Sequence, residues 1–367
     1  MLKKSMIALL MSILLILLVG CGANQPNGHN NSNSAANAKD TNSAEAPNES
    51  ETADSEAQQE EKIEGTLNFY TSQPDADAAK LVEAFNAKYP DVKVSIFRSG
   101  TEEVISKIQA EKLAGSIQAD LLLVADAVTF EILKEQDLLM SYQSKELKGI
   151  PAEYADPDYT YTGTKIIATA LAVNTDIVKE IPESWNVLIS ESAKGQAMMP
   201  GPLYSGAAAY NVGVFTRTEG FGWDFFEGLK ANDMVVAKGN GGVLKAVAGG
   251  EKAYAMVVDF LVARAEQEGS PVKLIYPKEG VPAITEPVGI LKNTRNAAAA
   301  KAFVDFILSE EGQKMQSELG YTPIRSGISA PAGLMGIDEM NVLSADINEL
   351  YKNREQDKEH FTTVFGE

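Results

Sequence analysis

Cysteine is nearly absent from this chain of 367 residues, in which Cys21 is the single instance. A disulfide within the chain is therefore impossible, and the folded part must hold together by packing. About 300 residues follow the polar N-terminal region, and a length of this order exceeds one typical core. The length therefore favours two lobes.

Histidine is also scarce, because His29 and His360 are the only two and lie outside the segments with the patterns of folded structure. Serine or cysteine catalysis with a histidine base needs an imidazole beside the nucleophile, and a histidine-rich zinc site needs several. Neither arrangement can be built in the core. We expect a protein that is not an enzyme and that uses no cofactor or metal. Catalysis by carboxylates alone, or by a serine–lysine pair, stays open.

Positive charge is in deficit, with 32 Lys and Arg against 51 Asp and Glu and a net charge of −19. Nucleic-acid binding requires a basic surface, so this composition argues against it. The acidic balance favours solubility and leaves the charge of a ligand open, because a few local groups dominate a pocket. No Gly-x4-Gly-Lys-Ser/Thr pattern occurs, so a P-loop is absent.

The N-terminus has the charged, apolar and small-residue order of a secretion signal. Lys3 and Lys4 precede an apolar run over 6–19, which leads through Gly20 to Cys21. The run is shorter than the roughly 20 apolar residues of a spanning helix. It resembles a bacterial lipoprotein signal peptide over 1–20, which implies lipidation of Cys21 and anchorage on the extracellular face of the cell membrane. An uncleaved membrane anchor is the alternative.

Residues 21–62 begin with the cysteine and continue with Asn, Ser, Ala, Glu and Gln, with almost no large apolar side chain. Such a segment cannot bury enough apolar surface to offset the entropy lost on ordering. We expect a disordered tether that links the lipidated cysteine to the folded part.

After residue 62, short apolar strands alternate with helical patterns. The strand pattern of 67–70 is followed by helical spacing over 75–88, and the apolar run 119–124 suits a strand buried on both faces. This alternation predicts an α/β fold with parallel strands. The apolar run 166–173 is a candidate crossing into a second lobe.

Four turns each lead from a strand into a helix and carry small residues. A helix start offers free backbone N–H groups and partial positive charge, which bind oxyanions, while Ser and Thr add hydroxyl donors. Ligands of open α/β sheets bind beyond the carboxyl ends of strands, where such turns lie. Simple N-capping is the alternative role. The candidate ligand-binding residues in these turns are Thr71, Ser72, Gln73, Ser99, Gly100, Thr101, Tyr204, Ser205, Gly206, Ala207 and Asn240.

Two carboxylates end apolar strands. Asp126 follows the run 119–124 and either caps the next helix or accepts a hydrogen bond from a ligand. Asp259 follows the apolar stretch 254–258, and at the carboxyl end of a strand we expect it to face the ligand. Tyr276 is a further candidate ligand contact.

In their order and spacing, several segments resemble the ferric-ion and phosphonate type of bacterial extracellular solute-binding protein, which serves ABC transporters. The resemblance covers residues 63–330 and implies a type II periplasmic-binding-protein-like clamshell with hinge strands. It implies a discontinuous first lobe, 63–165 plus 284–367, and a second lobe, 166–283. It also implies a monomer that captures a small-molecule ligand between the lobes and delivers it to an ABC permease in the membrane. The matching segments are 69–94, 99–126, 182–208, 243–259 and 286–313.

Iron-holding members of this family commonly use adjacent tyrosines after a strand of the second lobe. The corresponding residues here are Phe260 and Leu261, an apolar pair that suits Fe(III) poorly, because Fe(III) prefers phenolate and carboxylate oxygens. We therefore predict a small, polar, oxyanionic solute that is phosphorylated or of phosphonate type. A ligand sensor for a receptor kinase and a carboxylate-based surface hydrolase are further alternatives. The main alternative is a carrier of iron or a ferric complex, with oxygens from Tyr204, Tyr276, Asp259 or Glu286.

Overall fold

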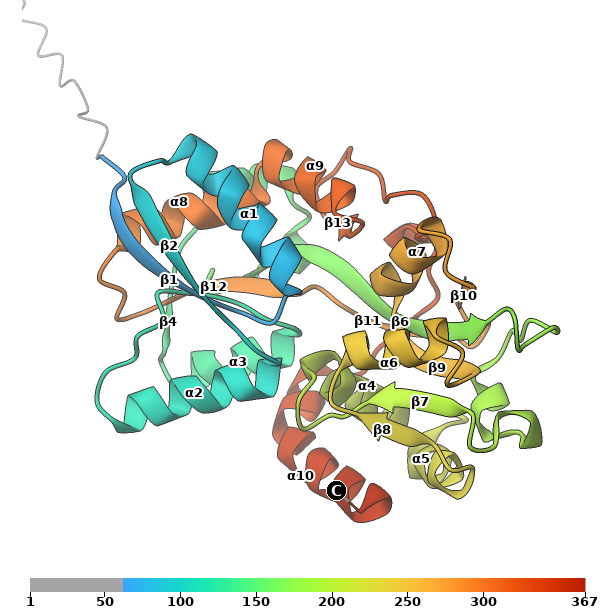
Figure 1. Cartoon of the computed structure of the whole chain (residues 1–367). Helices are drawn as coiled ribbons and strands as arrows, with labels where there is room; N and C mark the ends of the chain where they lie inside the picture. The colour runs from blue at the N-terminus through green and yellow to red at the C-terminus, as the bar shows by residue number, and fades with distance from the viewer. Residues whose placement is uncertain (1–61, 367) are drawn as a thin grey trace, which may run out of the picture. The chain divides into compact units, whose positions relative to one another are not determined.

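The computed structural model describes residues 62–366, and the predicted signal peptide, Cys21 and most of the predicted tether lie outside them (Figure 1). The described chain contains two β-sheets. The strands of the first sheet are β1 (Gly65–Thr71), β2 (Val92–Arg98), β3 (Leu121–Leu123), β4 (Leu139–Met140), β5 (Thr162–Gly163) and β12 (Pro287–Leu291). Their order is β2-β1-β3-β12-β4, with β5 also paired to β12. β1 is parallel to β2 and β3, whereas β12 is antiparallel to its neighbours.

The second sheet is built around one long strand. Its strands are β6 (Lys165–Asn174), β7 (Ala197–Pro200), β8 (Val235–Ala237), β9 (Tyr254–Val258), β10 (Val272–Ile275), β11 (Val281–Ile284), β13 (Thr322–Pro323) and β14 (Val342–Leu343). Their order is β14-β11-β6-β9-β7-β8, and β10 and β13 also pair with β6. Every residue of β6 is buried, as expected for a strand covered on both faces.

Helices flank both sheets. Those beside the first are α1 (Asp75–Lys88), α2 (Thr101–Leu113), α3 (Ala127–Glu135), α8 (Ala297–Leu308) and α9 (Glu310–Glu318). Those beside the second are α4 (Gly206–Arg217), α5 (Gly222–Ala231), α6 (Asn240–Ala248), α7 (Asp259–Gln267) and α10 (Ile347–Phe365). Short 3-10 helices occupy Lys145–Gly149, Ala152–Tyr154, Trp185–Ile189, Glu191–Ala193 and Ile337–Glu339. The predicted α/β fold is confirmed.

Each sheet has its own aromatic core. Phe69, Phe85 and Phe303 pack together beneath the first sheet, with ring centroids 4.5 to 5.1 Å apart. Trp185 and Phe215 meet edge to face at 5.3 Å beneath the second. We call the first sheet with its core the first lobe, and the second sheet with its core the second lobe.

Within residues 62–366, three chain segments cross between the lobes, the third from α9 to β13, and the first two lie side by side. One passes through Thr164 from β5 to β6, and the other passes through Thr285 and Glu286 from β11 to β12. The Thr164 amide donates to the Thr285 carbonyl at 2.9 Å, and the Thr164 hydroxyl donates to the Glu286 carbonyl at 2.7 Å. These bonds hold the two crossing segments together.

The C-terminal helix departs from the predicted division of the chain, which assigned all of 284–367 to the first lobe. Phe361 and Phe365 of α10 belong to the core of the second lobe, where Phe361 packs against Phe226. Asp357 of α10 pairs with Arg217 of α4 at 2.7 Å. Helix amphipathicity alone does not say which sheet a helix covers, and this one is rooted in the second lobe (Figure 1). Within residues 62–366, none of the helices is both long enough and apolar enough to cross a membrane.

Candidate functional site

A cavity of about 450 Å³ lies between the two lobes. Its walls come from the turns before α1 and α2 in the first lobe, from the turns before α4 and α6 in the second, and from the crossing segments. A volume of this order suits a small-molecule ligand. Of the predicted site residues, the structure brings together around it Ser72, Gly100, Thr101, Tyr204, Ser205, Gly206, Ala207 and Asn240.

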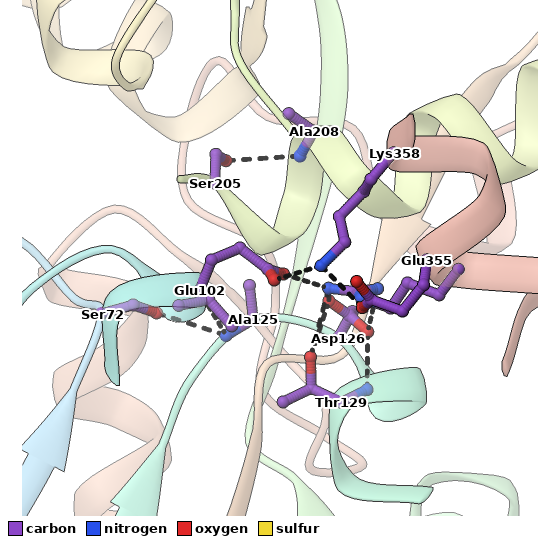
Figure 2. A network of polar contacts seen from close by, with 11 residues as sticks. Ser72, Glu102, Ala125, Asp126, Thr129, Ser205, Ala208, Glu355 and Lys358 are labelled. Carbon is purple, nitrogen blue, oxygen red and sulfur yellow. Dashed lines mark hydrogen bonds and ion pairs between the residues drawn. The ribbon is translucent and has the colours of Figure 1, made fainter. Parts of the chain in front are cut away.

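Two hydroxyls of the first lobe share one backbone donor. The Ala125 amide lies 3.2 Å from Ser72 Oγ and 3.3 Å from Thr101 Oγ1 and donates to both (Figure 2 shows the contact with Ser72). An oxygen that accepts from an N–H keeps its own hydrogen for another acceptor. Within residues 62–366, neither hydroxyl has a hydrogen-bond acceptor of its own. Both are therefore set to donate into the cavity.

Ser205 repeats this arrangement in the second lobe. Its Oγ accepts from the Ala208 amide and from Asn240 Nδ2, each at 3.3 Å (Figure 2 shows the first contact). Asn240 is fixed in turn, because its side-chain oxygen accepts from the Val258 amide at 3.2 Å. The Ser205 hydroxyl has no acceptor among the described residues, so it too is a free donor.

Backbone donors add to the hydroxyls. Gly206 and Ala207 open α4 and line the cavity, and no acceptor for their amides occurs within residues 62–366. The first amides of a helix have no partner inside the helix and carry partial positive charge. The starts of α2 and α6 face the same cavity, at Gly100 and Asn240. Three helix starts from both lobes therefore converge on one space.

Two cations line the cavity. Arg98 is anchored through its Nε, which donates to the Gln73 carbonyl at 2.7 Å. Lys238 lies over the ring of Tyr204, 4.6 Å from the centroid, and pairs with Glu103 at 2.9 Å. An exposed pair such as Lys238–Glu103 contributes little to stability. Arg98 is the better placed cation for an anionic ligand.

The other predicted site residues lie outside the cavity lining. Thr71 is fully buried, and its hydroxyl oxygen accepts from the Gln73 amide at 3.1 Å. Gln73 is also buried, while the Ser99 hydroxyl donates to the Glu103 carboxylate. Asp126 caps α3 by accepting from the Thr129 amide at 2.9 Å, and it pairs with Arg354.

Asp259 does not face the cavity, contrary to expectation, because it is the first residue of α7 and its carboxylate turns beneath β6. It accepts from the Ala168 amide at 3.2 Å and from its neighbour Phe260 at 2.8 Å. The Tyr276 hydroxyl donates to it at 3.0 Å, which places Tyr276 outside the lining as well. Burial raises the pKa of Asp259 to about 7, against these hydrogen bonds.

Glu286 is a cavity residue that the analysis of turns missed. It lies in a crossing segment, is only 4 % exposed, and forms an ion pair with the fully buried Lys165. Its φ of 30° is strained for a residue with a side chain, and such strain concentrates at functional sites. The Lys165 ammonium also lies 4.6 Å from the ring centroid of Tyr321, which lines the cavity. A lysine at the head of the apolar strand 165–174 was the signal available in the sequence.

The lobes touch across the cavity. The Glu102 amide of the first lobe donates to the Tyr204 carbonyl of the second at 3.3 Å. Phe260 and Leu261, the apolar pair singled out in the sequence, line the cavity. Within the described part of the chain, no group of three or more His, Cys, Asp or Glu side chains is placed to hold a metal ion.

Comparison of the sequence with curated proteins finds binding proteins of importers. A Sinorhizobium fredii relative, named provisionally as an ABC transporter periplasmic-binding protein, is 25% identical over 66% of this chain and 69% of its own. A Salmonella typhimurium relative, named provisionally as a 2-aminoethylphosphonate-binding periplasmic protein, is 25% identical over 74% of this chain and 86% of its own.

Solved structures show the same two-lobe fold. The periplasmic binding protein AfuA of Actinobacillus pleuropneumoniae, solved with fructose-6-phosphate, matches with a TM-score of 0.77 and 26% identity, over 82% of this chain and 98% of its own. Iron-bound HitA of Pseudomonas aeruginosa matches with a TM-score of 0.71 and 25% identity, over 81% and 99%. The predicted type II clamshell is confirmed.

The family model of the bacterial extracellular solute-binding proteins matches residues 80–335, which is most of the folded chain. This match agrees with the cavity between two lobes and with the relatives above. The chain therefore belongs to the family of bacterial extracellular solute-binding proteins, and it is a periplasmic-type solute-binding protein of an ABC importer.

Proposed function

We propose that this protein captures a small oxyanionic solute, phosphorylated or of phosphonate type, and delivers it to its ABC permease without transforming it. The observation that carries the proposal is the hydrogen bonding of three hydroxyl groups. Ser72, Thr101 and Ser205 each use their oxygen to accept from an N–H group, which leaves the hydroxyl hydrogen for a ligand. The charged oxygens of an oxyanion are strong acceptors, so a set of donors fits them.

The chemistry of the walls supports an oxyanion over iron. Arg98 and three helix starts supply positive charge and donors, while Phe260 and Leu261 supply no oxygen. Fe(III) would need phenolate or carboxylate ligands. Of those in the lining, Glu286 is already paired with Lys165, and the Tyr321 hydroxyl donates to Asp77. Relatives include proteins named for 2-aminoethylphosphonate, fructose-6-phosphate and iron, so the chemistry of this cavity has to decide among them.

Glu286 points to a second group on the solute. A carboxylate oxygen in the cavity wall repels an oxyanion, yet it accepts hydrogen bonds from a hydroxyl or an ammonium group. We infer that the solute carries its oxyanion towards the helix starts and a donor group towards the crossing segments. Glu286 then has the acceptor role that the sequence suggested for Asp259.

The hydroxyl donors come from both lobes, so a bound solute should bring the lobes together. Ser72 and Thr101 belong to the first lobe and Ser205 belongs to the second, so a solute that contacts all three favours the state in which the lobes meet. The permease would respond to that closed state. We further propose that the protein acts as a monomer, with 1–20 as its signal peptide and a lipid on Cys21 that holds it outside the cell membrane.

Calorimetric titration of the purified protein tests the proposed solute. We expect 2-aminoethylphosphonate, fructose 6-phosphate or inorganic phosphate to bind, and ferric citrate not to bind. Thr101→Val keeps the shape of the side chain and removes one donor, so affinity for the bound probe should fall roughly tenfold or more. Thr363→Val makes the same change on an exposed part of α10 and should leave affinity unchanged. Binding of ferric citrate alone would refute the proposal.

A further inference from the structure

Helix α10 contacts both lobes through two separate stripes of side chains. Asp357, Phe361 and Phe365 follow one another at a spacing of four residues and bind the second lobe. Arg354 and Lys358 form the neighbouring stripe at the same spacing and reach the first lobe, as Figure 2 shows for Lys358 and Glu102. The helix thus packs into the core of the second lobe and forms ion pairs with the first lobe.

The Arg354 contacts are buried and numerous. Arg354 is only 5 % exposed. Its guanidinium donates to Asp126 Oδ1 at 3.2 Å and to Asp126 Oδ2 at 3.1 Å. It also donates to Glu102 Oε1 at 2.7 Å and to the Thr129 hydroxyl at 3.3 Å. Lys358 binds the other oxygen of Glu102 at 2.8 Å. Burial alone would raise the pKa of Glu102, but Arg354 and Lys358 lower it, so this carboxylate is ionised at neutral pH.

The contact between Arg354 and Asp126 lies one residue away from Ala125, whose amide is the shared donor of the cavity. Asp126 has a φ of 64°, an unusual conformation for a non-glycine residue, and its carboxylate is held by Arg354 and by the start of α3. The preceding residue, Ala125, donates its amide to both Ser72 and Thr101. Asp126 is the next residue along the chain, so the arginine anchors the backbone directly after that amide.

We propose that Arg354 is a positioning residue of the ligand site, through which the C-terminal helix of the second lobe orients the hydroxyl donors of the first. When the lobes meet, Arg354 fixes Asp126, Asp126 fixes the Ala125 amide, and that amide leaves the Ser72 and Thr101 hydrogens free for the ligand. The donors of one lobe are therefore completed by contact with the other. For its ligand readout, the inference rests on the proposed oxyanion site.

Arg354→Met tests this role against Arg217→Met, which removes the other arginine paired along α10 but affects the second lobe alone. Both variants should lower the melting temperature. Only Arg354→Met should raise the dissociation constant of the oxyanion bound by the wild type, by tenfold or more, and Arg354→Lys should restore part of the loss. Equal affinities in Arg354→Met and Arg217→Met would overturn the inference.

Hydrogen–deuterium exchange of the unliganded full-length protein supplies a readout that needs no ligand. We expect faster exchange of the Ala125 amide in Arg354→Met, with Arg217→Met like the wild type. If no oxyanion binds, the proposed solute is wrong, while the exchange result still decides the role of Arg354. If Arg354→Met does not fold, Arg354→Lys replaces it, because lysine keeps the charge but lacks the forked guanidinium that contacts Asp126 and Glu102 together. A two- to threefold faster exchange at Ala125 would then support the inference, and unchanged exchange would refute it.

Discussion

Gly206 of the second lobe lies directly against Thr101 of the first. A methyl group on Gly206 would come within 2.9 Å of three atoms of the Thr101 side chain, closer than carbon atoms in contact can lie. The glycine therefore lets the start of α4 approach the start of α2, and the two helix starts can face one ligand.

Gly206→Ala should weaken ligand binding without lowering the stability of the protein. Gly206 is the first residue of α4, where the interior preference of about 1 kcal/mol for alanine over glycine counts for little, so the melting temperature of the unliganded protein should change little. The added methyl group should hold the lobes apart and weaken binding of the oxyanion at least tenfold, as measured by calorimetry. Gly228→Ala, inside α5 and against the partly exposed Ile189 side chain, is the matched control and should bind like the wild type. Normal affinity in Gly206→Ala would show that close approach at this point is not needed.

Asp259 gives stability a defined pH dependence. Burial raises its pKa from 3.8 to about 7, although Tyr276, Phe260 and Ala168 donate hydrogen bonds to it. Between these two values, the folded protein keeps a proton that the unfolded chain has released. The free energy of unfolding therefore falls as pH rises through this window and levels off above it, by at most about 1.4 kcal/mol per pH unit from this group.

Asp259→Asn should remove that contribution, because its oxygen can still accept the two amides and its NH2 group can donate to Tyr276. Urea unfolding at several pH values should show the variant gaining on the wild type between about pH 4 and about pH 7. Asp224→Asn, on the exposed side of α5, should keep the wild-type slope. Parallel curves for Asp259→Asn and the wild type would contradict the assignment.

The contributions of Lys165 and Glu286 to the free energy of unfolding should be strongly coupled. Removing one partner leaves a buried charge unpaired, so Lys165→Met should cost roughly 3–5 kcal/mol of unfolding free energy. The double variant Lys165→Met with Glu286→Gln removes both charges and should recover much of that loss. Urea unfolding of the two single variants and the double variant measures the coupling. Additive losses would mean that the two side chains do not act as a pair.

Glu286→Gln also tests which end of the solute meets the crossing segments. A neutral amide accepts more weakly from an ammonium group than a carboxylate does. Affinity for 2-aminoethylphosphonate should therefore fall at least fivefold, while affinity for inorganic phosphate, which lacks the amine, should hold or rise. Calorimetry with the two probes gives the comparison. An equal loss for both would place Glu286 outside the contact with the donor group.

Local sequence patterns predicted which turns line the cavity better than they predicted which carboxylates do. Thr101 and Ser205 could be placed beside the cavity because a strand, a small residue and a helix follow one another within a few positions, and all of these are local signals. Asp259 ends a strand in the same way, but whether its carboxylate enters the cavity or turns beneath β6 depends on amides of another strand.

Contacts between distant parts of the chain left less trace in the sequence. Glu286 and Lys165 meet across two crossing segments, and no periodicity links positions so far apart. Likewise, the apolar face of α10 does not say which core it enters, and the division that assigned 284–367 to the first lobe did not separate this helix from α8 and α9.

The place of α10 also bears on the order in which the chain can fold. Synthesis proceeds from the N-terminus, and domains generally fold as units. The second lobe receives Phe361 and Phe365 from α10, so its core stays incomplete until α10 has been made. A prematurely terminated chain would lack two buried aromatic rings as well as Arg354. A chain that stops before α10 would therefore have a poorly packed second lobe and would be a substrate for proteolysis.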